Sequence, residues 1–568
     1  MTATRVTPRE YLRALARRGA VILTSGALLG GVFAWHDPRY PVRFRPGNLI
    51  VSRSVYDNLA GTVQVGMILP PGCATTTGGC GAASGAPDNG LYPTVWNNDA
   101  YDGSFGITSP LFLDEISPEG ELIGTLPVPK GRPGSKRDHL VTSFSSKSEG
   151  ALNLSTDRQY LTFIDYYAHP DSLDASNSNT PGANDPTNPV GEGVYRAVAQ
   201  LDRWGTFQFT LTNAYSGNNG RAAILNNSNG ANVYYTAGNA GNGSNPQPNG
   251  IILGAGAQII TPSDLPERLQ TPGTPTPVGS FNVTELGDKA DKIGKDDNFR
   301  GLTIFNNVLY YTKGSGGNGV NTVYFLDVTG QACPKGFGVP ASNATLPTTS
   351  LTYNLATLQT SGLPSNICIL AGFPTILAKT STAFPFGIWF ANAKTLYVAD
   401  EGDGAGATTL YTHAAAQTTA GLQKWVFDSV KQTWSMAYTL QTGLGLGVPY
   451  TVKGYPTGNN PATSLPWAPA TDGLRNITGR VNHDGTATIW GITSTVSGNG
   501  DQGADPNSLM SVTDKLSNAD PTVAAAEHFH LVRRSRYLEV LRGVSFAPGT
   551  EEHGDHDRDD DDHGDHDR

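Results

Sequence analysis

The sequence is poor in charged residues, cysteine and methionine for a chain of 568 residues. Only 15% of its residues are charged, and it has 4 Cys and 4 Met. Glycine is abundant instead, with 68 residues, beside 38 Pro and 22 Tyr. Low charge with many turn-forming residues is typical of a β-rich extracellular protein.

Motifs that identify the common catalytic classes are also missing. There is no Gly-x-Ser-x-Gly, no phosphate-binding loop and no Cys-x-x-Cys pair for zinc or redox chemistry. Histidines in the body of the chain form no Ser/His/Asp or His-x-x-x-His grouping; they include His169, His483, His528 and His530. The sequence therefore names no reaction.

The formal charge of −10 comes mostly from the C-terminal tail. Residues 551–568 contain ten acids and two arginines, a net of −8, which leaves 39 acids against 37 bases elsewhere. A nearly neutral body with no basic patch excludes a nucleic-acid partner. The tail cannot bury a core and is expected to be disordered.

An export signal is predicted at the N-terminus. Arg17 and Arg18 follow three further arginines and precede an apolar run from Gly19 to Ala34. The run is about 16 residues, short for a membrane span of about 20. We expect cleavage near Trp35 and a periplasmic, cell-surface or extracellular location. The alternatives are an uncleaved membrane anchor and a buried helix. Contact with a membrane is expected only if the segment stays uncleaved.

Export places the four cysteines in an oxidising compartment. Cys73 and Cys80 would then close a small Gly/Thr-rich loop, and Cys333 and Cys368 a second loop within one blade. Four free thiols are the alternative.

A strand-forming unit recurs along the chain at intervals of about 65–90 residues. Each copy begins with a small residue or glycine and continues as an apolar strand; the starts lie near residues 149, 221, 300, 387, 475 and 542. The spacing exceeds the 40–50 residues of an ordinary propeller blade, and loop insertions account for the excess. The sequence thus predicts an all-β fold, a single β-propeller with six blades, or alternatively seven.

The last copy, Leu541–Pro548, has no room for partner strands after it. The strand at 48–57 and the hairpin at 110–127, with its turn at Ser117–Gly120, have no inner strand before them. Pairing of these N-terminal strands with Leu541–Pro548 would close the ring and remove its exposed edges. The predicted divisions are 1–34 signal or anchor, 35–47 linker, 48–548 propeller and 549–568 acidic tail.

Several of these segments, in this order, resemble a group of secreted, mostly bacterial β-propeller-like proteins. They are Phe112–Leu122, Ser148–Asp157, Tyr215–Arg221, Phe299–Leu302, Leu396–Asp400 with Gly421–Trp425, and the closing strand Arg542-Gly-Val-Ser-Phe-Ala-Pro548. The resemblance covers about residues 48–548. It implies the fold and export but no activity. The chain departs from the group in its insertion at 66–105, its loop at 168–193 and its acidic tail.

Charged side chains gather at the start of the predicted inner strands. Four copies have an arginine there and one a glutamate, and Asp297 lies just upstream of one arginine; the binding candidates are Glu149, Arg221, Asp297, Arg300, Arg475 and Arg542. One interpretation is an anion or sugar-acid site at the channel mouth. The other, which we favour, is that each arginine braces the neighbouring blade.

Two acidic segments are weak candidates for metal binding. Asp400, Glu401 and Asp403 follow a predicted strand, although Gly402 and Gly404 leave this segment without the ligand spacing of a calcium loop. The tail repeats His-Gly-Asp-His-Asp-Arg, and its histidines could bind divalent metals weakly; they are His553, His556, His563 and His566. No cofactor is established, and Ca²⁺ or another divalent metal is the one considered for these segments. Solvated turn acids and a solubilising tail are the alternatives.

Aromatic residues are expected mainly in the core between blades, with a few free to stack on sugars; those considered are Tyr166, Tyr167, Tyr215, Tyr234, Tyr235, Trp389, Trp425 and Trp490. The predicted function is binding of an extracellular ligand (a glycan, protein or anion) or a structural role. The alternative is a hydrolase or lyase for an extracellular carbohydrate or lactone, using the arginines with Asp297 or Asp400.

Overall fold

The computed structural model describes one compact unit within Arg43–Arg568. The described residues are 43–56, 107–129, 140–172, 175–181, 193–239, 256–263, 298–315, 319–333, 336–349, 367–405, 408–461, 463–499 and 502–551. The predicted signal, the first disulfide (Cys73 with Cys80), Asp297 and the tail histidines lie outside them. No helix in the described part is long and apolar enough to cross a membrane.

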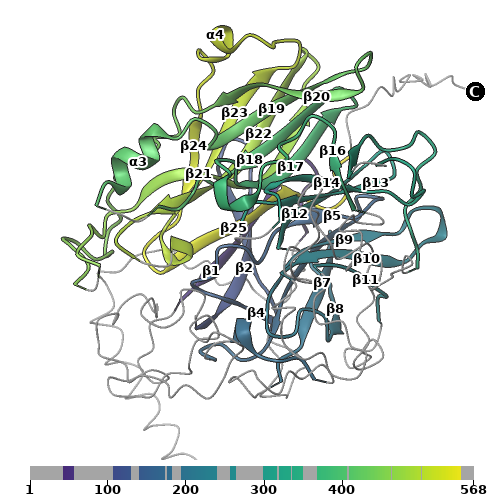
Figure 1. The fold of residues 1–568 in the computed structure, drawn as a ribbon. Coiled ribbons are helices and arrows are strands. Elements are labelled where there is room, and N and C mark those ends of the chain that lie inside the picture. Colours follow the sequence, from purple (N-terminus) through teal and green to yellow (C-terminus); the bar gives the residue numbers. More distant parts are fainter. Residues whose placement is uncertain are drawn as a thin grey trace, which may run out of the picture. The chain divides into compact units, whose positions relative to one another are not determined.

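The described chain is all-β, and its named strands pair antiparallel except β15 with β16 (Figure 1). Its largest sheet has nine strands. These are β25 (Glu539–Phe546), β1 (Leu49–Val55), β2 (Thr108–Ile116), β4 (Leu140–Ser143), β6 (Tyr160–Tyr167), β7 (Arg196–Asp202) and β8 (Phe207–Thr212) in that order, with β3 (Leu122–Pro127) on β2 and β5 (Asn153–Leu154) on β6.

Four further sheets have three to five strands each. They are β9 (Gly220–Asn226), β10 (Val233–Gly238) and β11 (Ala257–Ile260); β12 (Phe299–Phe305), β13 (Val308–Lys313), β14 (Thr322–Leu326), β16 (Ile367–Leu370) and β15 (Phe337–Gly338); β17 (Pro385–Asn392), β18 (Thr395–Asp400), β19 (Gly421–Asp428) and β20 (Thr433–Leu440); and β21 (Ala470–Val481), β22 (Thr486–Val496), β23 (Ser508–Lys515) and β24 (His530–Arg534). Two short helices, α3 (Leu410–Ala416) and α4 (Pro521–Ala524), and the 3₁₀ turns η2 (Ala175–Asn177), η3 (Ser228–Gly230), η4 (Ala378–Thr380) and η5 (Gln502–Ala504) lie in loops.

Six strands, which we call the inner strands, pack side by side in a series that returns to its start. Their order is β5, β9, β12, β17, β21, β25 and again β5. Hydrophobic clusters lie between neighbouring sheets, as between the β6–β8 strands and the β9–β11 sheet, and between β22–β23 and the β25–β1–β2 strands. Sheets set around a common series of inner strands form a propeller-like arrangement.

Glycines explain why the repeated motif marks these strands. A Cβ on Gly301 of β12 would stand 2.1 Å from the carbonyl oxygen of Phe386 in β17. A Cβ added to Gly387 of β17 would stand 2.4 Å from the carbonyl oxygen of Arg475 in β21, and a Cβ added to Gly543 of β25 would stand 2.5 Å from the carbonyl oxygen of Gly150. At these three positions the neighbouring backbone lies too close for a Cβ atom, and only glycine fits.

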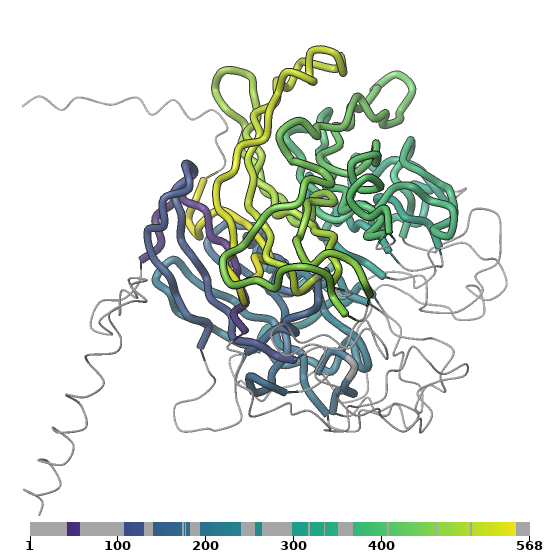
Figure 2. Tube along the Cα trace, turned by 90° about the vertical axis from the view of Figure 1, so that its left-hand side faces the viewer, coloured from purple at the N-terminus to yellow at the C-terminus, as the bar shows by residue number. Residues whose placement is uncertain are grey.

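The predicted pairing between the two ends of the folded body is confirmed. β1 runs antiparallel to β25, with Leu49 opposite Phe546 and Val51 opposite Val544 (Figures 1 and 2). The 110–127 hairpin is confirmed as β2–β3, with Gly120 N–H donating to Ser117 O at 2.9 Å in its turn.

The strand expected at 148–154 is shorter, since only Asn153–Leu154 is extended and paired. The preceding segment, residues 143–146, surrounds the guanidinium of Arg542. This guanidinium donates hydrogen bonds to the carbonyl oxygens of Ser143 (2.9 Å), Phe144 (2.6 Å) and Ser146. These carbonyls therefore serve a side chain in place of a neighbouring strand.

The predicted Cys333–Cys368 pair is confirmed. The two cysteines are disulfide-bonded, with their Cα atoms 5.9 Å apart, and Cys368 lies in β16.

Candidate functional site

The starts of the inner strands form a buried charged centre. Arg221, Arg300, Arg475 and Arg542 are 3–5% exposed, and Glu149 is fully buried. The structure thus brings together the described binding candidates from the sequence. Two residues that were not candidates there, Lys147 and Arg196, belong to the same centre.

Arg542 is held entirely by groups of the protein. Besides the three carbonyls of the 143–146 segment, it receives support from Ser54, whose hydroxyl oxygen lies 3.0 Å from its Nε. Arg196 is similar, because it donates to the carbonyls of Val194 (2.6 Å), Ser176 (3.1 Å) and Ser178 (3.0 Å), and to that of Asn218. Both arginines join separate segments and act as scaffold.

Among the described residues, Arg221 and Arg300 donate to neutral acceptors. Arg221 donates to the side chain of Asn298 and to Phe299 O at 2.9 Å, across to the β12 strand. Arg300 donates to the hydroxyls of Ser148 and Ser315. The Nε atoms of both arginines are buried and have no hydrogen-bond partner in the part of the chain that the structure describes.

Glu401 balances the other side of the centre. Its Oε2 lies 3.4 Å from Arg475 Nε and 3.3 Å from the Nζ of Lys147, which is 31% exposed. Burial alone would raise the pKa of Glu401, but Lys147, Arg300 and Arg475 outweigh it and hold that pKa below its usual value. Glu401 is therefore a counterion for Lys147, Arg300 and Arg475 in the charged centre.

The three acids of the 400–403 segment point to different partners. Asp400 accepts from Phe384 N–H (2.8 Å) and Gly402 N–H (3.0 Å), and burial raises its pKa to about 7. Asp403 pairs with His413 at 2.5 Å on the surface. Within the described residues, the one group spaced for metal binding is Asp327 with the two disulfide-bonded cysteines, so the divalent-metal hypothesis stays a prediction.

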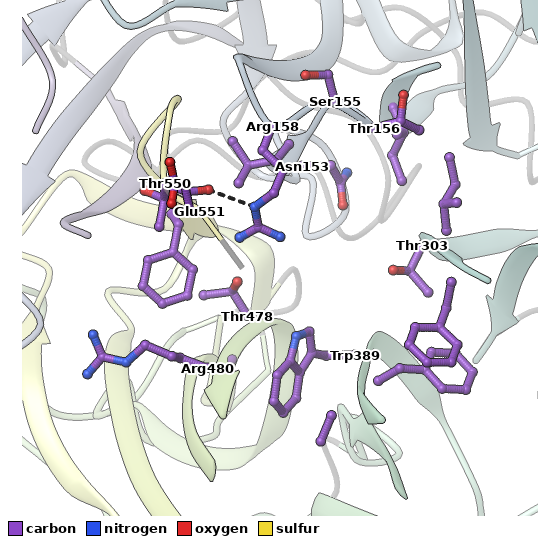
Figure 3. Close-up of a pocket in the computed structure, with 18 of the residues that line it drawn as sticks. Asn153, Ser155, Thr156, Arg158, Thr303, Trp389, Thr478, Arg480, Thr550 and Glu551 are labelled. Carbon is purple, nitrogen blue, oxygen red and sulfur yellow. Dashed lines mark hydrogen bonds between the residues drawn. The ribbon is translucent and has the colours of Figure 1, made fainter. Parts of the chain in front are cut away.

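The other end of the inner strands opens into a cleft of about 710 Å³, shown in Figure 3. All six inner strands contribute to its lining: Asn153 and Leu154, Ile224, Thr303–Phe305, Trp389–Ala391, Thr478–Val481 and Phe546. Arg158, Thr550 and Glu551 complete the rim. The cleft thus combines aromatic rings with amide, hydroxyl and guanidinium groups.

Trp389 provides a fixed aromatic surface in this cleft. Its ring stacks on Tyr397, with centroids 5.7 Å apart and planes 23° apart, and is half-buried. A Cβ on Gly479 of β21 would stand 2.6 Å from the indole ring, so this glycine makes the room that the ring occupies. Phe305 and Phe390 form a second stack nearby, with centroids 4.5 Å apart.

Polar side chains face the same space. In Figure 3 the Arg158 guanidinium and Thr478 lie on one side of the cleft and Thr303 lies across from them, with Trp389 between. Arg158 Nε donates to Thr550 O at 2.7 Å, which fixes the guanidinium at the rim. Arg480 points away and lies over the ring of Trp490, 5.7 Å from its centroid.

Sequence reasoning missed this cleft. Trp389 was among the aromatic residues expected in the core, and Trp425 (6% exposed) and Trp490 (2%) are indeed buried there. The sequence does contain one signal for the cleft, which is the position of these residues in the repeat. Residues two to four places after the repeated glycine step lie at the far end of each inner strand, where the cleft is.

No family model and no curated protein matches the sequence. Among solved structures, the chain is similar to an exo-1,5-α-L-arabinanase from a bovine ruminal metagenomic library, at 8% identity and a TM-score of 0.25. The match covers 58% of this chain and 91% of that one. Identity and score this low say nothing about ligand or activity, so the propeller-like arrangement rests on the strand pairing and the inner-strand contacts.

Proposed function

We propose that the chain is an exported, six-bladed ligand-binding propeller related to the secreted propeller-like group that its motifs resemble. Six blades follow if the nine-stranded sheet holds two, β25–β1–β2–β3 and β5–β6–β7–β8. The four-residue strand β4 pairs with both β2 and β6 and would fuse them into one sheet. The Arg-rich N-terminal signal and the disulfide support export.

The proposed ligand is a saccharide, held in the cleft at the far end of the inner strands. The observation that carries this proposal is the fixed Trp389 surface facing a rim of hydrogen-bonding groups within one cleft. A sugar ring has an apolar C–H face and a polar edge, so it suits an aromatic plane beside amide, hydroxyl and guanidinium groups. The volume of about 710 Å³ falls within the range of small-ligand sites.

We infer binding in preference to hydrolysis. Glycoside hydrolysis ordinarily needs two carboxyl groups on either side of the scissile bond. Among the described residues that line the cleft, Glu551 is the one carboxylate, and it is exposed at the rim. Asp400, a candidate acid for the hydrolase hypothesis, does not line this cleft and is buried under backbone N–H donors.

A glycan array tests the proposal directly. The full chain without its signal is labelled and applied to immobilised neutral and acidic oligosaccharides of bacterial and plant origin. We expect selective, saturable binding to one structural class, with competition by the free sugar. Failure to bind any class, with reducing-sugar release from a soluble polysaccharide, would replace binding by hydrolysis; failure of both would refute a saccharide ligand.

A further inference from the structure

The charged centre at the starts of the inner strands has more buried cations than its carboxylates neutralise by contact. Arg221, Arg300 and Arg475 are 4%, 5% and 3% exposed. Among the described residues, Arg475 is the one of these three that forms an ion pair, with Glu401. Buried polar groups ordinarily find hydrogen-bond partners, as Arg196 and Arg542 do with backbone carbonyls. Arg221 and Arg300 differ, because each keeps a buried Nε without a partner in the described part of the chain.

Arg221 and Arg300 are also unfavourably placed relative to each other. Burial lowers the pKa of Arg221 well below its ordinary value, and the positive charge of Arg300 lowers it further. Burial likewise lowers the pKa of Arg300; Glu401 opposes that shift and Arg475 adds to it. Glu149 favours the charged form of both arginines but does not restore their ordinary pKa. A negative group between these guanidiniums would relieve both desolvation and repulsion.

Glu149 lies in the same electrostatic neighbourhood but does not neutralise the arginines by contact. Its Oε1 accepts from two neutral donors, Tyr166 OH at 2.5 Å and Asn219 Nδ2 at 3.1 Å. Its Oε2 is buried and, among the described residues, has no hydrogen-bond partner, like the Nε atoms of Arg221 and Arg300. Both carboxylate oxygens of Asp165, which interacts electrostatically with Glu149 and Arg542, are also buried without a hydrogen-bond partner, and burial raises the pKa of Asp165 well above its ordinary value. In the described part of the chain, the centre therefore presents two guanidinium donors and the carboxylates of Glu149 and Asp165 with unpartnered atoms.

We propose that this centre binds a protonated oxyanion, namely a phosphate group, between Arg221 and Arg300 with Glu149 as acceptor. The guanidiniums donate to the phosphate oxygens, a geometry for which arginine is well suited. The acidic proton of a hydrogen phosphate donates to Glu149 Oε2. Sulfate carries no proton at neutral pH, so its oxygen would face the carboxylate without a hydrogen bond, and the site should reject it.

The same chemistry can come from free phosphate or from a phosphate monoester on a larger ligand. The site is separate from the saccharide cleft, because no residue of the charged centre lines that cleft. It therefore stands or falls independently of the saccharide proposal.

Calorimetry and thermal melting of the full chain test it, with phosphate and sulfate compared at equal ionic strength and pH 7. We expect one phosphate per chain and sulfate binding weaker by about tenfold or more, the cost of one unmet buried hydrogen bond. A phosphate monoester has a second pKa of about 6, so methyl phosphate and phosphate are compared at pH 5.5, where both carry a proton for Glu149. Methyl phosphate binding as tightly as phosphate would assign the site to a monoester ligand, and weaker binding to free phosphate; either result supports the site.

Glu149→Gln provides the sharpest variant, since glutamine keeps the Tyr166 and Asn219 contacts through its carbonyl oxygen. Its amide now donates, so we expect sulfate to bind at least as well as phosphate. Arg300→Met should remove binding of both anions, and the selectivity switch in Glu149→Gln keeps the test valid if that variant does not fold. Absence of phosphate binding, or equal effects of the two anions in wild type that Glu149→Gln leaves unchanged, would overturn the proposal.

Discussion

Arg542→Ala should destabilise the protein by breaking the contact between the last inner strand and the first strands of the chain. Arg542 lies in β25, is 4% exposed, and donates to three carbonyls of the 143–146 segment and to Ser54 of β1. The substitution leaves these acceptors buried. It also removes a positive charge that lowers the pKa of Asp165, whose burial already raises that pKa well above its ordinary value.

The expected loss is about 3–5 kcal/mol. One unsatisfied buried acceptor costs about 1–3 kcal/mol, and removing one partner of a buried charged network costs about 3–5 kcal/mol. Because partial repacking and water relieve some of the four contacts, their costs do not sum. Urea denaturation followed by far-UV circular dichroism measures the change in midpoint at constant slope.

Arg536→Ala is the matched control, since Arg536 lies six residues earlier on an exposed turn. Surface substitutions of this kind change stability by about 0.5 kcal/mol or less. If Arg542→Ala unfolded at the same urea concentration as Arg536→Ala, the closing role of this side chain would be refuted.

Three further predictions concern the fold. Gly387→Ala places a Cβ 2.4 Å from a backbone carbonyl of the next inner strand and should cost at least about 1–3 kcal/mol, whereas Gly124→Ala, with nothing within 4 Å, should be neutral; urea midpoints compare them. Burial raises the pKa of Asp505 to about 6 from an ordinary 3.8, so its stabilising contribution is complete below about pH 4 and lost as the pH rises through 6. Between pH 4 and pH 8, the free energy of unfolding of Asp505→Asn should therefore rise relative to that of the wild type by up to about 3 kcal/mol. If the difference in unfolding free energy between the two proteins were the same at both pH values, the raised pKa of Asp505 would be contradicted. Reducing the Cys333–Cys368 disulfide should cost about 2–4 kcal/mol, and melting with and without reductant tests this.

The sequence was informative wherever packing demands one residue type. The glycine steps mark the inner strands because a Cβ at Gly301 or Gly387 would meet the next strand's backbone. The pairing of β1 with β25 was also predicted, because the last strand motif has no strands after it and the N-terminal strands have no inner strand before them. The strand expected at 148–154 is shorter, Asn153–Leu154. Just before it, Arg542, about 390 residues away, donates to the carbonyls of Ser143, Phe144 and Ser146, a long-range contact that no local pattern encodes.

For the candidate site, too, the position of residues could be predicted from the sequence, whereas their long-range contacts could not. The arginines could be placed together because they share one position in the repeat, and the structure brings them into one centre. Their contacts could not be predicted, since Arg542 meets carbonyls, Arg300 meets hydroxyls and Arg475 meets a carboxylate. The cleft at the other end has no shared residue type. Aromatic, aliphatic and polar residues occupy equivalent positions there, so only the folded chain shows that they converge.

The most direct test of the saccharide proposal is the affinity of Trp389→Ala for the sugar selected on the glycan array, measured by titration calorimetry. Truncating a central aromatic contact typically costs about 2 kcal/mol or more, a loss of about 30-fold in affinity. Trp204→Ala is the control, because Trp204 is 50% exposed and lies outside the cleft. We predict the loss in Trp389→Ala alone, with unchanged melting of both variants; equal affinity of Trp389→Ala and Trp204→Ala would contradict binding in this cleft.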